Sequence, residues 1–135
     1  METINTTPER IMALMTDALE SIWHCDKRIE DKTKQLQQLA AKVADYSTRE
    51  MMYSGGMCFK EMQRESDNLR SYANEMRGLV QEFGSLRFLC EIKTPEELRE
   101  DVLPELLQSD KRYQEMGRDM LVKQGLEIYI REACL

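Results

Sequence analysis

The longest regular pattern in the chain lies in residues 15–46, which read MTDALESIWHCDKRIEDKTKQLQQLAAKVADY. Apolar residues recur there in alternating steps of three and four, a spacing that places them on one face of an α-helix. They are Met15, Ala18, Ile22, Cys25, Ile29, Leu36, Leu39, Val43 and Tyr46, with Lys32 as the one charged member. No glycine or proline occurs between Pro8 and Gly55. The pattern predicts one long helix whose apolar stripe, a heptad seam, packs against another helix.

Local signals predict where this helix begins and ends. The sequence Thr6-Thr7-Pro8-Glu9 is typical of a helix start, because threonine can cap and proline loses no hydrogen bond at the first helical position. The first glycines of the chain follow Ser54, at positions 55 and 56. Two adjacent glycines favour the backbone conformations of a turn. We therefore expect a tight turn at residues 54–56.

After this turn the spacing of three and four resumes. The second series is Met62, Glu65, Leu69, Tyr72, Met76, Leu79, Phe83, Leu86 and Cys90, and it predicts a second helix that ends near Ile92. Two such helices joined by a short loop pack antiparallel, and a turn at 54–56 pairs positions whose residue numbers add to about 110. In that register Lys32 and Glu65 do not face each other, which leaves both able to face a partner.

Residues 94–135 are predicted to form an acidic helical segment and a tail. Thr94-Pro95-Glu96-Glu97 matches a capping box, and Pro104 predicts either a kink or a break into two short helices. The later helix would carry Leu106, Leu107, Tyr113, Met116, Met120 and Leu121 and end at Gly125. Residues 126–131 fit a strand and a helix equally well. The predicted fold is all-α: an elongated antiparallel helical hairpin, a coiled coil, over residues 1–93, followed by one or two shorter helices.

Composition excludes several classes of function. The 135 residues carry 25 acidic and 19 basic side chains without a Lys/Arg block, which argues against direct binding of nucleic acid. No apolar run approaches the roughly 20 residues of a membrane span, and the first ten residues are polar and acidic, unlike a signal peptide. We expect no membrane insertion and an intracellular location, cytoplasmic or nuclear. The four cysteines have no Cys-x-x-Cys spacing, so free thiols are expected.

Catalytic and metal-binding arrangements are weak in this sequence. The one histidine, His24, follows Glu20 by four positions, whereas a di-metal bundle site needs Glu and His three apart. His24 also adjoins Cys25, and consecutive side chains on a helix diverge, so a Cys-His pair is not expected. Gly55-Gly56 lacks the spacing of a phosphate-binding loop. The sequence predicts a protein that is not an enzyme, with no catalytic residue, no cofactor and no bound metal.

Two groups of apolar residues lie outside the predicted pairing of the helices. Ile11, Met12, Leu14 and Met15 extend past the end of the second helix, so either the C-terminal segment or a partner must cover them. The second group, named here the tip cluster, consists of Met51, Met52, Tyr53, Met57, Phe59 and Met62. Thioethers adapt to varied surfaces and aromatic rings make strong interface contacts, so the tip cluster is a candidate docking site. The alternative is that these apolar side chains pack against one another or against the rest of the chain and bind no partner.

Together these observations predict a non-enzymatic subunit or adaptor that binds other protein chains by helix–helix packing. A hetero-oligomer is favoured over a homodimer. The alternative is a small acidic chaperone or regulator that masks a helix of a client protein. The two differ in solution, because a permanent subunit folds poorly alone whereas a chaperone is stable and binds reversibly.

Overall fold

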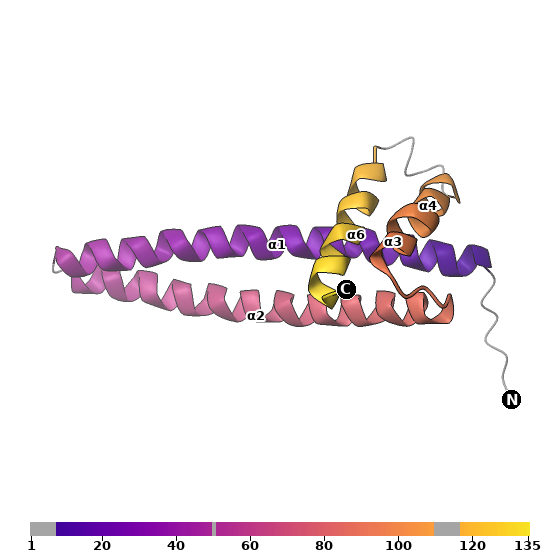
Figure 1. Ribbon diagram of the computed structural model, residues 1–135. Helices are drawn as coiled ribbons and strands as arrows, with labels where there is room; N and C mark the ends of the chain where they lie inside the picture. Colours follow the sequence, from indigo (N-terminus) through magenta and orange to yellow (C-terminus); the bar gives the residue numbers. More distant parts are fainter. Residues whose placement is uncertain (1–7, 50, 110–116) are drawn as a thin grey trace, which may run out of the picture. The chain divides into compact units, whose positions relative to one another are not determined.

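The computed structural model describes residues 8–49, 51–109 and 117–135. Two long helices, α1 (Pro8–Thr48) and α2 (Met52–Leu89), pack antiparallel as a hairpin, as Figure 1 shows. The shorter helices that follow are α3 (Pro95–Glu97), the π-helical turn η1 (Leu98–Val102), α4 (Leu103–Ser109) and α6 (Asp119–Ala133). The predicted all-α class, with a helical hairpin and shorter C-terminal helices, is confirmed.

The chain divides into two compact units. Unit 1 combines Met1–His24 with Arg77–Leu135, and unit 2 is Cys25–Met76. Each unit contains one part of α1 and one part of α2, and each is described separately below.

The turn of the hairpin, in unit 2, lies earlier than predicted. Helix α1 ends at Thr48 and α2 begins at Met52, so both glycines are helical and the prediction of a turn at 54–56 is wrong. The Met51 amide donates to the Tyr46 carbonyl (2.8 Å), a bond typical of a helix C-terminus. The Gly55 amide then donates to the Met51 carbonyl (2.9 Å). The chain therefore reverses between the end of α1 at Thr48 and the start of α2 at Met52, ahead of both glycines.

The earlier turn changes which residues face each other across unit 2. Lys32 forms an ion pair with Glu65, and Arg28 lies 3.4 Å from Glu75. The Cys25 thiol donates a hydrogen bond to the backbone carbonyl of Tyr72 in α2 (3.3 Å). In each contact the two residue numbers add to about 100 rather than 110. The predicted separation of Lys32 from Glu65 is therefore wrong, and the displaced turn is the reason.

The core of unit 1 is built from residues of α1, α2, η1, α4 and α6. Its fully buried apolar side chains, each at most 1% exposed, are Met15, Leu19, Ile22, Phe83, Leu98, Leu106, Val122, Leu126 and Tyr129. The Phe83 and Tyr129 rings pack at a centroid distance of 4.4 Å. Segments from both ends of the chain thus share one apolar core, whose burial is the main stabilising term for a unit of this size.

The segment before α6 begins as its sequence predicts. The Thr94 hydroxyl accepts a hydrogen bond from the Glu97 amide (3.2 Å), and Pro95 occupies the first helical position. Pro104 has no amide hydrogen to donate to the carbonyl four residues earlier. The helix widens to the π form of η1 directly before this proline, and the Leu103 amide donates to the Leu98 carbonyl. The π turn lets residues 95–109 remain helical through the proline.

Helix α6 contains Gly125, so the prediction that this glycine ends the helix is wrong. An added Cβ at position 125 would lie 2.2 Å from the carbonyl oxygen of Leu19. Figure 1 shows α6 crossing α1 in this unit. Glycine is therefore required because the two backbones approach closely, not because the helix stops. Residues 126–131 are helical, which excludes the strand alternative, and Tyr113 and Met116 lie outside the described residues.

Candidate functional site

The tip cluster exposes most of its apolar surface. Met51, Met52, Tyr53, Met57 and Phe59 are between 43% and 83% exposed, and Met62 is half-buried. They follow the end of α1 and fill the first turns of α2, so their side chains share a short length of helix. Monomeric proteins rarely group so many large apolar side chains at the surface unless they bind something there.

Two hollows accompany these side chains. The first, of about 240 Å³, is lined by Val43, Ser47, Met51, Met52, Gly55, Gly56 and Phe59. The second, of about 280 Å³, is lined by Met57, Cys58, Lys60, Glu61 and Arg64. The glycines contribute no side chain to the first hollow, and an added Cβ at Gly56 would meet no atom within 4 Å. Both volumes lie below the usual range for small-molecule pockets and suit a single side chain of a protein partner.

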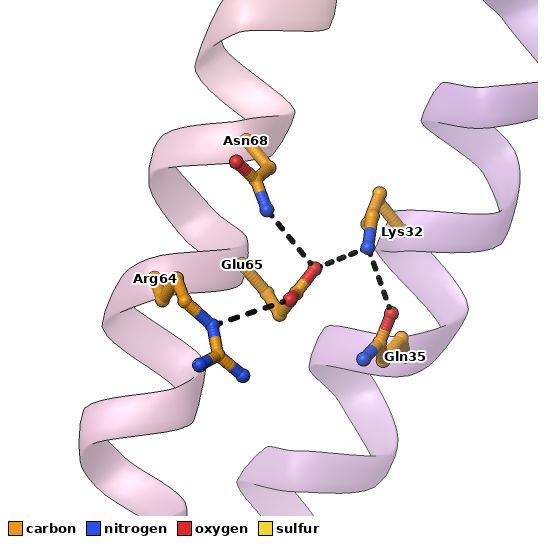
Figure 2. A network of polar contacts seen from close by, with 5 residues as sticks. All are labelled: Lys32, Gln35, Arg64, Glu65 and Asn68. Carbon is orange, nitrogen blue, oxygen red and sulfur yellow. Dashed lines mark hydrogen bonds and ion pairs between the residues drawn. The ribbon is translucent and has the colours of Figure 1, made fainter.

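A polar network interrupts the apolar seam of unit 2. Figure 2 shows Glu65 accepting from the Lys32 ammonium and, at 3.5 Å, from the Asn68 amide. Lys32 also donates to the Gln35 side chain (3.3 Å), and Arg64 lies 3.7 Å from the second Glu65 oxygen. Glu65 is only 6% exposed. The two seam charges therefore satisfy each other within the chain and are not directed at a partner.

Lys32 also controls the ionisation of Glu65. Its hydrogen bond outweighs the opposing effect of burial and holds the pKa of the Glu65 carboxyl below its ordinary value of 4.5. A carboxyl whose pKa is lowered by folding stabilises the fold above its unfolded pKa, and this contribution disappears as the pH falls through the folded pKa.

Glu65→Gln is therefore expected to lower the thermal midpoint at pH 7 but to have little effect at an acidic pH below the lowered pKa of the folded carboxyl, where the wild-type side chain is itself neutral. Circular dichroism melting at both pH values measures the difference. Glu75→Gln is the control, since the Arg28–Glu75 pair also joins α1 to α2 but both side chains are about half exposed. A Glu65→Gln effect that is equal at the two pH values would contradict the assignment.

The N-terminal apolar group is more covered than the tip cluster. Met15 is 1% exposed, and Ile11, Met12 and Leu14 are half-buried. Helix α6 packs against α1 farther along, at Leu19 through Gly125 and through a hydrogen bond from the Trp23 indole to Gln124 (2.7 Å). This group therefore presents less apolar surface to a partner.

Residues weighed for catalysis do not assemble into a site. His24 lies 3.8 Å from Glu20 and edge-on to Trp23, whose ring centroid is 5.1 Å away. Burial raises the pKa of the Cys25 thiol, so this sulfur is a poor nucleophile. Within the described ranges, no three His, Cys, Asp or Glu side chains come together as metal ligands would. In the same part of the chain, no helix is long and apolar enough to cross a membrane.

A second exposed apolar pair, Phe88 and Leu89, was missed by the sequence analysis. These residues at the end of α2 are 82% and 60% exposed. The predicted rule that paired residue numbers add to about 110 puts Leu89 near Ile22, in the interior of the hairpin. A hollow of about 720 Å³ adjoins the pair and is lined by Gln81, Gly84, Ser85, Arg87, Phe88 and Leu89. A signal was present, because Gly78, Gln81, Ser85 and Phe88 are uncharged residues at steps of three and four.

Comparisons of this chain with protein-family models, with curated proteins and with solved structures find no match.

Proposed function

We propose that the protein is a non-enzymatic adaptor or subunit of a larger assembly, which binds another protein chain through the tip cluster. The observation that carries this proposal is the exposure of Met51, Met52, Tyr53, Met57 and Phe59 within three turns of one hairpin end. A third of the residues in the chain are charged, yet this group contains no charge. Hydrophobic burial at such a surface is a sufficient source of binding free energy.

The chemistry of the cluster favours a helical partner. Met52 and Tyr53 are the most exposed side chains of the tip cluster. Aromatic rings and thioethers supply large contact areas to apolar helix faces. The hollow bounded by Val43, Gly55 and Phe59 accepts one partner side chain. Binding would thus consist of a partner helix that packs on the tip and inserts a residue between α1 and α2.

The core of unit 1 favours reversible binding. Leu98, Leu106 and Tyr129 are fully buried by the chain itself, so this unit does not need a partner to complete its core. A chain that folds alone and binds reversibly fits an adaptor, and it fits the small acidic chaperone or regulator equally well. The four cysteines are free, which supports an intracellular location, cytoplasmic or nuclear.

The triple variant Met52→Ser, Tyr53→Ser, Met57→Ser tests the proposal. Quantitative affinity capture from the cells that make the protein is expected to recover at least one protein with the wild type and about tenfold less of it with the variant. The recovered protein, once purified, should bind the wild-type chain directly. Circular dichroism of the variant should show unchanged helix content, because all three side chains are exposed.

Met120→Ser is the matched control, since Met120 is 56% exposed on α6 and lies outside the tip cluster. It should retain the partner. Recovery of the same proteins by the wild type and the triple variant alike would reject the tip cluster as the docking surface.

A further inference from the structure

The outer face of α2 in unit 1 carries a second pattern of heptad spacing. Gly78, Gln81, Ser85 and Phe88, named here the outer stripe, are all exposed and all uncharged. Each lies two positions after a seam residue, which places it about 200° around the helix, on the side away from α1. A helix face without charged side chains can be buried against a further helix with little desolvation cost.

The outer stripe is complementary to itself. Phe88 is 82% exposed, whereas a Cβ added at Gly78 would meet no atom within 4 Å. A large side chain and an open glycine thus lie on one face, ten residues or about 15 Å apart. Three residues of the stripe, Gln81, Ser85 and Phe88, line the hollow of about 720 Å³ together with Gly84, Arg87 and Leu89.

We propose that this surface binds a second copy of the chain, with the two α2 helices antiparallel about a two-fold axis. In this arrangement Phe88 of each copy packs over Gly78 of the other, and Gln81 lies opposite Ser85. Each contact then occurs twice, as in any isologous interface, and each large residue meets a small one. The inference goes beyond the proposed function, because it concerns a different face and a different partner.

Burial of the outer stripe costs little desolvation free energy, because its polar atoms keep hydrogen-bond partners. The Ser85 hydroxyl already donates to the Gln81 carbonyl of its own helix (3.0 Å), so its hydrogen stays satisfied on association. The Gln81 side-chain amide meets the Ser85 hydroxyl of the second copy, which can accept from it. None of the four residues carries a charge that must lose its water.

Charged residues near the edges of the stripe act on the association in opposite directions. Arg77 is exposed, and the antiparallel pairing places it beside the end of the second copy's α2, which the exposed Glu91 follows. On the other edge Glu82 approaches its own counterpart near the two-fold axis, which opposes association. These opposing effects and the small interface predict a dissociation constant of about micromolar order.

Sedimentation equilibrium of the full chain over a range of concentrations tests this proposal. The wild type is expected to be a reversible dimer, and Phe88→Ser is expected to raise the dissociation constant by about thirtyfold or more. Tyr53→Ser is the control, since Tyr53 is 83% exposed on the same helix, and it should leave the dimer unchanged. This control also separates the two proposals, because it removes part of the tip cluster and none of the outer stripe.

Gly78→Leu tests the pairing without the risk of unfolding. Leucine is a better helix former than glycine, so the monomer becomes more stable while the space for Phe88 disappears. Loss of the dimer in this variant supports the proposal. A wild type that stays monomeric, a dimer that survives either Phe88→Ser or Gly78→Leu, or a monomer that uses Phe88 to bind a different protein would each overturn it.

Discussion

Phe83→Ala is expected to lower the free energy of unfolding of unit 1 by about 3–4 kcal/mol. Phe83 is fully buried, and the centroid of its ring lies 4.4 Å from that of the Tyr129 ring. The Arg87 guanidinium lies over the Tyr129 ring, 5.9 Å from the centroid of that ring. The substitution removes the aromatic pair and leaves a cavity that helices from distant parts of the chain cannot all move to fill.

Urea denaturation followed by tryptophan fluorescence measures this loss. Trp23 is the one tryptophan, and its indole donates to Gln124 of α6, so its emission reports whether α6 is packed on α1. Phe59→Ala is the control because Phe59 lies on the same helix but is 48% exposed, and its loss should stay below about 1 kcal/mol. Equal losses in the two variants would mean that Phe83 is not in a packed core.

Gly125→Ala should destabilise unit 1 by about 2 kcal/mol, although alanine is the better helix former. The new methyl group would lie 2.2 Å from the Leu19 carbonyl oxygen and 2.9 Å from its carbonyl carbon. Both are backbone atoms of α1, so no side chain can rotate away and α6 must move as a whole. That movement loosens the contacts of Leu126 and Tyr129, which are buried in the turn of α6 that follows Gly125.

Gly56→Ala is the matched control for this effect. Gly56 is also helical, but a Cβ there meets no atom within 4 Å. Alanine at this position should therefore stabilise the chain by about 0.5 kcal/mol. The same fluorescence and circular dichroism melts apply to both variants. Stabilisation by Gly125→Ala would show that α1 and α6 do not approach as closely as described.

Features with local causes were predictable from the sequence. The residue spacing of the two seams predicted both long helices, because burial of one face requires that spacing wherever the helices pack. The start of α3 was also predictable, since the Thr94 hydroxyl, Pro95 and Glu97 act within a single turn. The exposed tip cluster followed from its position beside the turn, even though the turn itself was placed too late.

Features with long-range causes were not predictable in this way. Gly125 was interpreted as a helix end because the sequence does not show that Leu19 lies against it. The register between α1 and α2 depends on the exact turn, and a shift of the turn by about five residues separated Lys32 from Glu65 in the predicted pairing. The same shift assigned Leu89 to the interior, so the exposed pair formed with Phe88 was missed.

Unit 1 is formed by two segments that are far apart in the sequence, and this determines the order in which the chain can fold. Unit 2 is a single continuous segment, Cys25–Met76, whose contacts close as soon as that segment has been synthesised. Unit 1 joins Met1–His24 to Arg77–Leu135, and Trp23 and Gln124 are 101 positions apart in sequence. On the ribosome, the part of α1 around Leu19 and Trp23 must wait for nearly the whole chain before α6 can pack against it. During synthesis this segment is therefore the part of the protein most open to aggregation or to capture by a chaperone.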